Sequence, residues 1–395
     1  AGRQNPTGGG VLERFDGLTG SYNLGSDWRV SAVAGNGVEF NQAGFSGFST
    51  PVYKKFYGAS VELLPQVSQP GANLYFVEQT LHGFLNRRAI GSEFRYFDGQ
   101  FSGFGSLDYD LLYKGLNIAT AQGNYLDQWG NNYFVSYDYR RSPSYSLANG
   151  VYAGVPGVAS VSDLVNQVGI EQARKLVKDV TDTATMFGAG VTIPVGDRWQ
   201  FGGDYRMSTV SGTNSMVQMS QFCKRLDFND GVDPICIGGP LGDTPISQLC
   251  ASYSYDPAGD PANNTCQLKQ SFNGTTHTFT AQAIGTNLFV TNGVGVAMAS
   301  FNEGPGFSGQ NYALNYIFPF AEVWRLESNL RYSTSKSTGG NGQTSFSPSV
   351  KLGYQWRSSL FLESEIGISN QKNTGTSAGE NKREYLYVGM RWDYR

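Results

Sequence analysis

The chain has 395 residues, of which 39% are hydrophobic and 15% are charged, and its formal net charge at pH 7 is −3. No run of about 18 apolar residues occurs, which excludes a transmembrane helix. The near-neutral charge, without clusters of Lys and Arg, excludes nucleic acid as a partner. Glycine, tyrosine and phenylalanine are plentiful, with 51, 23 and 25 residues. Low charge without high hydropathy suits strands that face lipid on one side and water or polar groups on the other.

Apolar and polar residues alternate along most of the chain, which is typical of strands with two different faces. Seventeen segments show this pattern or a weaker form of it: 18–24, 28–34, 57–63, 73–84, 88–97, 107–113, 116–126, 135–139, 184–194, 199–207, 276–286, 293–301, 311–319, 324–332, 352–356, 360–368 and 386–395. Single-chain bacterial barrels have an even strand number. Either one strand is missed, for instance within 143–156, or one candidate is not a barrel strand. We therefore predict an all-β fold, a transmembrane antiparallel up-and-down β-barrel formed by residues 1–395, with 16 strands or, as the alternative, 18.

The last ten residues show the clearest alternation. Side chains on one face are predicted to point toward lipid: Leu386, Val388, Met390, Trp392 and Tyr394. Arg391 and Asp393 belong to the opposite face because successive strand side chains point in opposite directions. We expect these two residues to lie beside Glu363 and Glu365 of the preceding strand.

Charges of both signs occupy the polar positions of the predicted strands. The predicted lumen-facing set is Glu93, Arg95, Asp108, Asp110, Asp138, Arg140, Asp204, Arg206, Arg325, Glu327, Arg331, Lys351, Glu363, Glu365, Arg391 and Asp393. Because the two signs are interleaved, the set is predicted to form a paired lattice that stiffens the barrel, whereas charges of one sign would select ions. The alternative is that some of these groups line a substrate path.

One segment departs from the strand pattern. Apolar residues recur at helical spacing over 161–180, with Ser160 or Ser162 as the N-cap and Asp163 in the first turn. The segment 144–182 is therefore predicted to be a helical insertion that either caps a mouth of the barrel or plugs its lumen.

All four cysteines, Cys223, Cys236, Cys250 and Cys266, lie in the polar stretch 213–275. An even number in one loop predicts two disulfides in an oxidising compartment, with three connectivities open. The rival interpretation, a zinc site, lacks a C-x-x-C spacing. Asp227, Asn229, Asp230 and Asp233 form a weak candidate for Ca²⁺, against a solvated turn; no other cofactor or metal is expected.

The lengths of the connections indicate which side of the membrane they occupy. The tight connections 194–198, 318–323 and 355–358 are typical of periplasmic turns, whereas 334–344, 370–383 and the cysteine stretch 213–275 are typical of extracellular loops. Toward the N-terminus the pattern is less regular, because Asn86-Arg87 and 113–115 are both predicted to be tight turns.

Segments 86–97, 107–117 and 387–394 resemble outer-membrane β-barrels of Gram-negative bacteria. More distantly, they are similar to the C-terminal barrels of tetratricopeptide-repeat proteins, such as exopolysaccharide-secretion porins of the cellulose type. That resemblance implies an outer-membrane location and, for the secretion porins, a lumen with stacking aromatic residues. Two features differ from the family: no repeat domain precedes the strands in this sequence, and Arg395 stands where the usual final residue is aromatic.

Two classes of function follow. The first is an outer-membrane, porin-like conduit for solutes or a secreted polymer. The second is a non-conducting interaction or structural protein that presents its extracellular loop to a filament, a protein or a glycan. Outer-membrane lipid and lipopolysaccharide are the expected surroundings, together with a periplasmic or extracellular protein partner. We do not expect an enzyme, because the only histidines, His82 and His277, lack a neighbouring Ser and Asp pattern.

Overall fold

The computed structural model describes the chain except residues 1, 6–7, 9, 12–13, 41–47, 50–52, 67, 152, 154, 156–157, 212–216, 220–224, 228–233, 240–241, 247–249, 255–263, 269–273, 338–339, 358, 376–377 and 394–395. It has two compact units. Unit 1 comprises residues 1–123, 137–185 and 210–273, and unit 2 comprises 124–136, 186–209 and 274–395. Among the helices described, none combines the length and the apolar character needed to span a bilayer.

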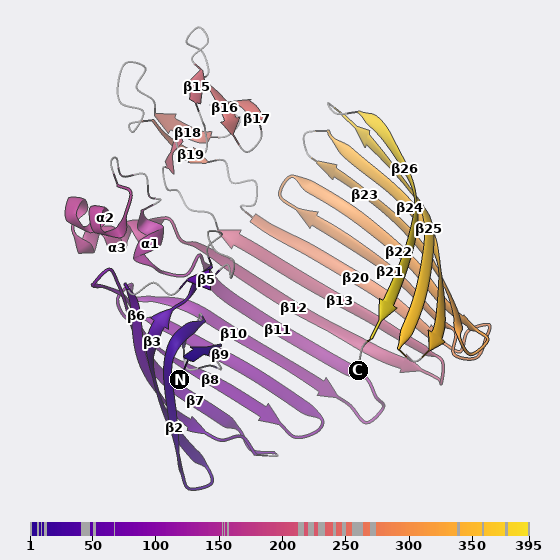
Figure 1. Ribbon diagram of the computed structural model, residues 1–395, viewed down its shortest axis with the longest axis horizontal. Coiled ribbons are helices and arrows are strands. Elements are labelled where there is room, and N and C mark those ends of the chain that lie inside the picture. Colours follow the sequence, from indigo (N-terminus) through magenta and orange to yellow (C-terminus); the bar gives the residue numbers. More distant parts are fainter. Residues whose placement is uncertain are drawn as a thin grey trace. The chain divides into compact units, whose positions relative to one another are not determined.

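Eighteen strands in the described residues form one antiparallel sheet, in which strands that follow one another in the chain run side by side (Figure 1). In unit 1 and at its boundary with unit 2 these are β1 (Gly2–Gln4), β2 (Phe15–Leu24), β3 (Trp28–Gly37), β6 (Lys54–Leu63), β7 (Gly71–Leu81), β8 (Phe84–Phe97), β9 (Phe101–Asp110), β10 (Gly115–Leu126), β11 (Asn132–Ser142), β12 (Asp182–Val195) and β13 (Trp199–Ser211). Unit 2 continues with β20 (Gly274–Thr286), β21 (Val294–Gly304), β22 (Phe307–Phe320), β23 (Trp324–Ser337), β24 (Gly342–Arg357), β25 (Leu360–Thr374) and β26 (Gly379–Trp392).

The predicted up-and-down antiparallel arrangement is confirmed, and each of the seventeen predicted segments overlaps one long strand. The eighteenth strand is β1, which pairs with β2 from Gly2 opposite Gly17 to Gln4 opposite Phe15. It was missed because three residues are too few to show an alternation. The count of 16 is not confirmed, and the sheet has the 18 strands of the alternative; 143–156 contains a short helix instead of the missing strand.

Two predicted turns lie elsewhere in the structure. The β7–β8 turn is His82-Gly83 and not Asn86-Arg87, with φ of 51° and 83°, as two-residue hairpin turns with a right-handed strand twist require. Strand β9 ends at Asp110, whereas 107–113 was predicted as strand. The Asp110 Oδ1 atom accepts the backbone N–H groups of Leu112 (2.8 Å) and Tyr113 (3.0 Å), which fixes a turn directly after the strand.

The helical insertion contains α1 (Leu147–Gly150), α2 (Val161–Val168) and α3 (Ile170–Asp179). The single helix predicted for 161–180 is therefore two helices, broken at Gly169, whose φ of 79° is incompatible with a continuing α-helix. The N-cap at Ser160 is confirmed, because its Oγ atom accepts the Asp163 N–H at 3.1 Å.

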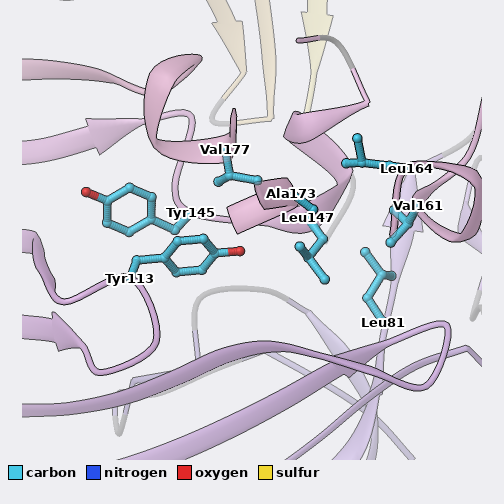
Figure 2. Packing of buried hydrophobic residues seen from close by; sticks show 8 residues of the cluster. All are labelled: Leu81, Tyr113, Tyr145, Leu147, Val161, Leu164, Ala173 and Val177. Carbon is cyan, nitrogen blue, oxygen red and sulfur yellow. The ribbon is translucent and has the colours of Figure 1, made fainter. Parts of the chain in front are cut away.

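A compact apolar core holds the three helices together and joins them to the strands. Its buried members are Leu81, Tyr113, Tyr145, Leu147, Val161, Leu164, Ala173 and Val177 (Figure 2). The rings of Tyr113 and Tyr145 stack with centroids 4.7 Å apart. Burial raises the pKa of both phenols, which therefore stay neutral within this core. Leu81 belongs to β7 and Tyr113 follows β9, so the insertion is anchored to the sheet of unit 1.

The cysteine stretch forms its own small sheets. Its strands are β14 (Val217–Gln218), β15 (Arg225–Asp227), β16 (Ile235–Gly239), β17 (Gly242–Pro245), β18 (Cys250–Ser254) and β19 (Thr265–Leu268). Outside this stretch, β4 (Glu39–Phe40) and β5 (Phe48–Ser49) form a separate two-stranded sheet. A disulfide joins Cys250 and Cys266, whose Cα atoms are 5.5 Å apart. Cys236 is also disulfide-bonded, and Cys223 lies outside the described residues. The three described cysteines pack with Met219 and Ile246 in a buried cluster, so the loop has a core of its own.

Candidate functional site

One face of the sheet in unit 2 carries exposed apolar side chains. The strand registers place Val350, Ile366 and Leu386 in one row on this face. Four of the five residues predicted to face lipid are on β26 and are 66–73% exposed, namely Leu386, Val388, Met390 and Trp392; Tyr394 lies outside the described residues. An exposed large apolar side chain forgoes about 1.5–3 kcal/mol of burial free energy. This face therefore requires an apolar environment.

Aromatic side chains lie at both ends of the apolar stretch on neighbouring strands. They are Tyr312 and Phe320 on β22, Tyr332 and Trp324 on β23, and Phe346 and Tyr354 on β24. The distance along β24 between its two aromatic residues is about 26 Å, at about 3.3 Å per residue. Lipid-facing bands of transmembrane barrels are about 25 Å tall and flanked by aromatic residues. With a strand tilt of about 35–45°, the aromatic residues of β24 would lie about 19–22 Å apart along the membrane normal, somewhat less than the height of such a band.

The opposite face of unit 2 carries a cluster of paired charges. The registers align Glu327, Lys351 and Glu365 across β23, β24 and β25. Lys351 Nζ lies 2.5 Å from Glu363 Oε2, and Arg325 Nη2 lies 2.8 Å from Glu327 Oε1. We call these five residues the Lys351 cluster. They bring five of the predicted lumen-facing residues together on one face.

Aromatic side chains border the Lys351 cluster. The Phe361 ring has the Arg325 guanidinium carbon 5.6 Å from its centroid and that of Arg391 at 5.7 Å, which is cation–π distance. The Tyr385 hydroxyl donates to Glu365 Oε1 at 2.8 Å. This face therefore offers ring surfaces as well as charges.

Arg391 and Glu363 are neighbours that form their ion pairs with other residues. Glu363 is opposite Gly389 in the β25–β26 register, and its carboxylate turns to Lys351 on its other neighbouring strand. Arg391 pairs with Asp393, which directly follows β26, at 3.4 Å. Arg391 is opposite Phe361 and so lies diagonally beside Glu363, as expected, although the ion pair of Glu363 is with Lys351.

Two further ion pairs join members of the predicted lumen-facing set within single strands. Asp138 bonds Arg140 on β11, and Arg206 Nε lies 3.1 Å from Asp204 on β13. Arg331 shares the face of Arg325 by alternation along β23. Each of these pairs is neutral as a whole, which leaves little net charge on the polar face.

In unit 1 the corresponding face holds a second group of charges. Arg95 Nη2 lies 2.7 Å from Glu62 Oε1, and Arg29 Nη1 lies 3.7 Å from the other oxygen of Glu62. Glu93 accepts a hydrogen bond from the Asn73 amide at 3.1 Å. Arg29, Glu62 and Asn73 were not predicted as site residues.

Asp108 is the centre of a buried network. The residue is 1% exposed. Its carboxylate accepts hydrogen bonds from Arg87 Nη2 (2.6 Å), Tyr75 OH (2.8 Å) and Asn117 Nδ2 (3.2 Å). Asp110, also 1% exposed, lies on the same face of β9. Two predicted lumen-facing residues are thus inside packed protein.

The N-terminal segment covers this network. Arg87 Nη1 donates to the Gly10 carbonyl at 2.7 Å. Gly10 has a φ of 75°, and a Cβ atom there would overlap the Tyr75 ring, so only glycine fits. Val11 packs beside the buried residues Phe56 and Val77 of β6 and β7.

The helical insertion is attached to β8 by a buried amide. Asn86 is 1% exposed, and its Oδ1 atom accepts the Leu147 N–H at 2.7 Å at the start of α1. Its Nδ2 atom donates to Gln79 of β7 at 2.8 Å. Whether the segment 144–182 acts as a cap or as a plug stays a prediction.

The structure does not test the weak calcium candidate. Asn229, Asp230 and Asp233 lie outside the described residues, and Asp227 is 4.0 Å from Arg225. Within the described chain, no group of three or more His, Cys, Asp or Glu residues could hold a metal ion. His82 stacks on Tyr53 with centroids 4.0 Å apart, and His277 Nδ1 lies 2.7 Å from the Tyr205 hydroxyl.

Searches against known proteins found similarity only at the level of structure. No family model and no curated protein matches the chain. The solved structures it resembles are outer-membrane proteins. A loop-deletion form of OmpT of Vibrio cholerae is 8% identical with a TM-score of 0.38, covering 95% of this chain and 99% of the other.

Two further solved structures are similar. OpdK of Pseudomonas aeruginosa, solved with vanillate, is 8% identical with a TM-score of 0.34, covering 96% of this chain and 93% of its own. A bacterial polysaccharide outer-membrane secretin is 6% identical with a TM-score of 0.32, covering 87% and 91%. Because fewer than one residue in ten is identical, no ligand or activity is carried over from these proteins.

Proposed function

We propose that the chain is a β-barrel of the bacterial outer membrane that serves as a conduit for solutes or for a secreted polymer. One observation carries the proposal: the sheet of unit 2 has an exposed apolar face with aromatic ends and, on its reverse, a polar face with paired charges. A bilayer would cover the first face. Closure of the sheet would turn the second face toward an aqueous lumen.

Accessibility of the polar face supports a conduit. Arg325 and Arg391 expose 46% and 72% of their side chains, although both take part in ion pairs. Paired charges keep the wall of a pore hydrated, and because they cancel they create no strong electrostatic potential of one sign. We infer that neutral or weakly charged polar cargo suits this wall best.

Planar-bilayer recording of the purified full chain tests the proposal. We expect stable single-channel steps with weak selectivity between K⁺ and Cl⁻, because the ion pairs on the wall are neutral. Insertion is verified independently by protease protection of the strands in vesicles. Inserted protein without conductance steps would contradict a conduit.

The non-conducting interaction protein is the second candidate, and two observations favour it. The N-terminal segment and the Asp108 network fill part of the polar face in unit 1. The cysteine stretch also has a buried core and a disulfide, which is more order than a passive loop needs. In this proposal the loop presents a surface to an extracellular protein or glycan, and inserted protein without conductance is the expected result.

Replacing Lys351 should change ion selectivity. Lys351→Gln removes the cation that the registers place between Glu327 and Glu365, so the cluster gains one net negative charge. We expect the K⁺ to Cl⁻ permeability ratio to rise by about twofold because a negative wall attracts cations. Reversal potentials in a KCl gradient measure this ratio.

The matched control is Lys351→Gln combined with Glu363→Gln, which removes both members of the pair and should restore the original ratio. If the single variant leaves the ratio unchanged in a conducting protein, the Lys351 cluster does not face the ion path.

We propose no enzymatic role and no resident cofactor. Both histidine rings contact tyrosines: His82 stacks on Tyr53, and His277 Nδ1 lies 2.7 Å from the Tyr205 hydroxyl. Outer-membrane lipid, lipopolysaccharide and a periplasmic or extracellular protein remain the proposed partners.

A further inference from the structure

The N-terminal segment covers a hollow on the polar face of unit 1. A cavity of about 400 Å³ is lined by Gln4, Asn5, Gly8 and Val11 of that segment and by residues of β2, β3, β6, β7 and β8. Gly8 has a φ of 123°, and a Cβ atom there would lie 2.8 Å from the Glu93 Oε2 atom. The segment therefore approaches the wall closely, and the cavity lies between the two.

A row of serine residues forms the floor of this cavity. The registers align Ser21, Ser31 and Ser60 across β2, β3 and β6, and all three line the cavity. Small side chains on neighbouring strands leave room above the sheet, and each hydroxyl can donate and accept hydrogen bonds. The floor therefore suits a polar solute.

The next row of the same face carries positive charge at one end. Glu62 is opposite Arg29, and its carboxylate lies 3.7 Å from Arg29 Nη1 and 2.7 Å from Arg95 Nη2. Two guanidinium groups share one carboxylate, so these three residues carry one net positive charge. The Arg29 and Arg95 side chains remain 39% and 47% exposed. This end of the cavity can bind an anionic group.

Glu93 and Asn73 continue the row on β8 and β7. The Asn73 amide donates to Glu93 Oε2 at 3.1 Å. The Asn73 Oδ1 atom is buried and has no hydrogen-bond partner among the described residues, which costs free energy. An ammonium group bound here would contact the Glu93 carboxylate and would also supply the donor that Asn73 Oδ1 needs.

The two ends of the cavity lie close together. Strands β6 and β8, which carry Glu62 and Glu93, are two strand spacings apart, about 10 Å between backbones. A ligand that bridges the ends through a charge-assisted contact of about 2.8 Å at each must be compact. The Lys351 cluster offers no such separation of charge, because Lys351 lies between Glu327 and Glu365 in one row.

We propose that the cavity binds a free α-amino acid in its zwitterionic form. The ligand carboxylate contacts Arg29 and Arg95, its ammonium group contacts Glu93 and Asn73, and its side chain lies over the serine floor. A zwitterion has no net charge, in agreement with the weakly charged polar cargo inferred for the wall. This inference rests on the proposed conduit and names a class of solute for it.

Isothermal titration calorimetry of the full chain in detergent tests the site with L-glutamine, N-acetyl-L-glutamine and L-glutamine α-amide. The second probe lacks the ammonium charge and the third lacks the carboxylate. We expect each to bind about tenfold more weakly than L-glutamine, because each loses one charge-assisted contact. Equal affinities for the three probes, or no binding of L-glutamine, would overturn the inference.

Two substitutions assign the contacts. In Glu93→Gln, L-glutamine and N-acetyl-L-glutamine should bind equally, because the carboxylate that distinguishes them is absent. Arg95→Gln should likewise remove the preference for L-glutamine over the α-amide. The matched control is Arg140→Gln, which removes an exposed arginine that does not line the cavity and should leave all three affinities unchanged. A preference that survives both substitutions, or that is lost in the control, contradicts the site.

Binding in detergent is independent of conductance, so the two proposals can fail separately. A chain that conducts but does not prefer L-glutamine contradicts only the amino-acid site. Inserted protein without conductance steps contradicts the proposed function, whatever it binds.

Discussion

Val350→Arg is expected to destabilise the membrane-inserted protein by about 2–4 kcal/mol, the cost of an Arg on the lipid face near the bilayer midplane. Val350 is 43% exposed and lies midway between Phe346 and Tyr354, the aromatic ends of the apolar stretch on β24. Its row contains Ile366 and Leu386, and neither side chain can pair with the new charge. Urea unfolding from vesicles, followed by tryptophan fluorescence, gives the free energy.

Ser349→Arg is the matched control, because it adds the same side chain one residue earlier on the polar face. The register places Ser349 opposite Asn329 and Gly367, on the polar face where the new charge can be hydrated. We expect a change within about 1 kcal/mol, as for most substitutions away from a packed site. Equal destabilisation by both variants would show that Val350 does not face lipid.

The two faces of the sheet could be predicted from the sequence because a strand alternates its side chains with a fixed period. The alternation of β26 places Leu386 and Arg391 on different faces without any knowledge of its neighbours. Strand number was harder, because β1 pairs through only three residues. The break at Gly169 was also missed, since the apolar residues on both sides keep a helical spacing.

Contacts between strands could not be predicted, because the period of a strand contains no information on register. The pairing of Lys351 with Glu363 depends on which residue of β24 faces which residue of β25. Phe361 was not predicted as a site residue, although its parity with Glu363 places it on the polar face. Arg87 and Tyr75 were missed because the segment that covers them is distant in sequence.

Asp108→Ala is expected to cost about 3–5 kcal/mol, since it leaves the Arg87 guanidinium buried without its counter-charge. Arg87 is 6% exposed, and the lost carboxylate also accepts from Tyr75 and Asn117. The same guanidinium holds the Gly10 carbonyl, so the N-terminal segment should become accessible to protease while the sheet stays inserted. Urea unfolding and limited proteolysis measure the two effects.

Two variants isolate the cause. Asp138→Ala breaks an exposed ion pair with Arg140 and should cost no more than about 1 kcal/mol, as surface pairs do. Arg87→Met combined with Asp108→Leu removes both buried charges and should recover much of the stability, because apolar side chains of similar volume replace buried pairs well. If the double variant is as unstable as Asp108→Ala, packing against the N-terminal segment, and not the unpaired charge, determines the loss.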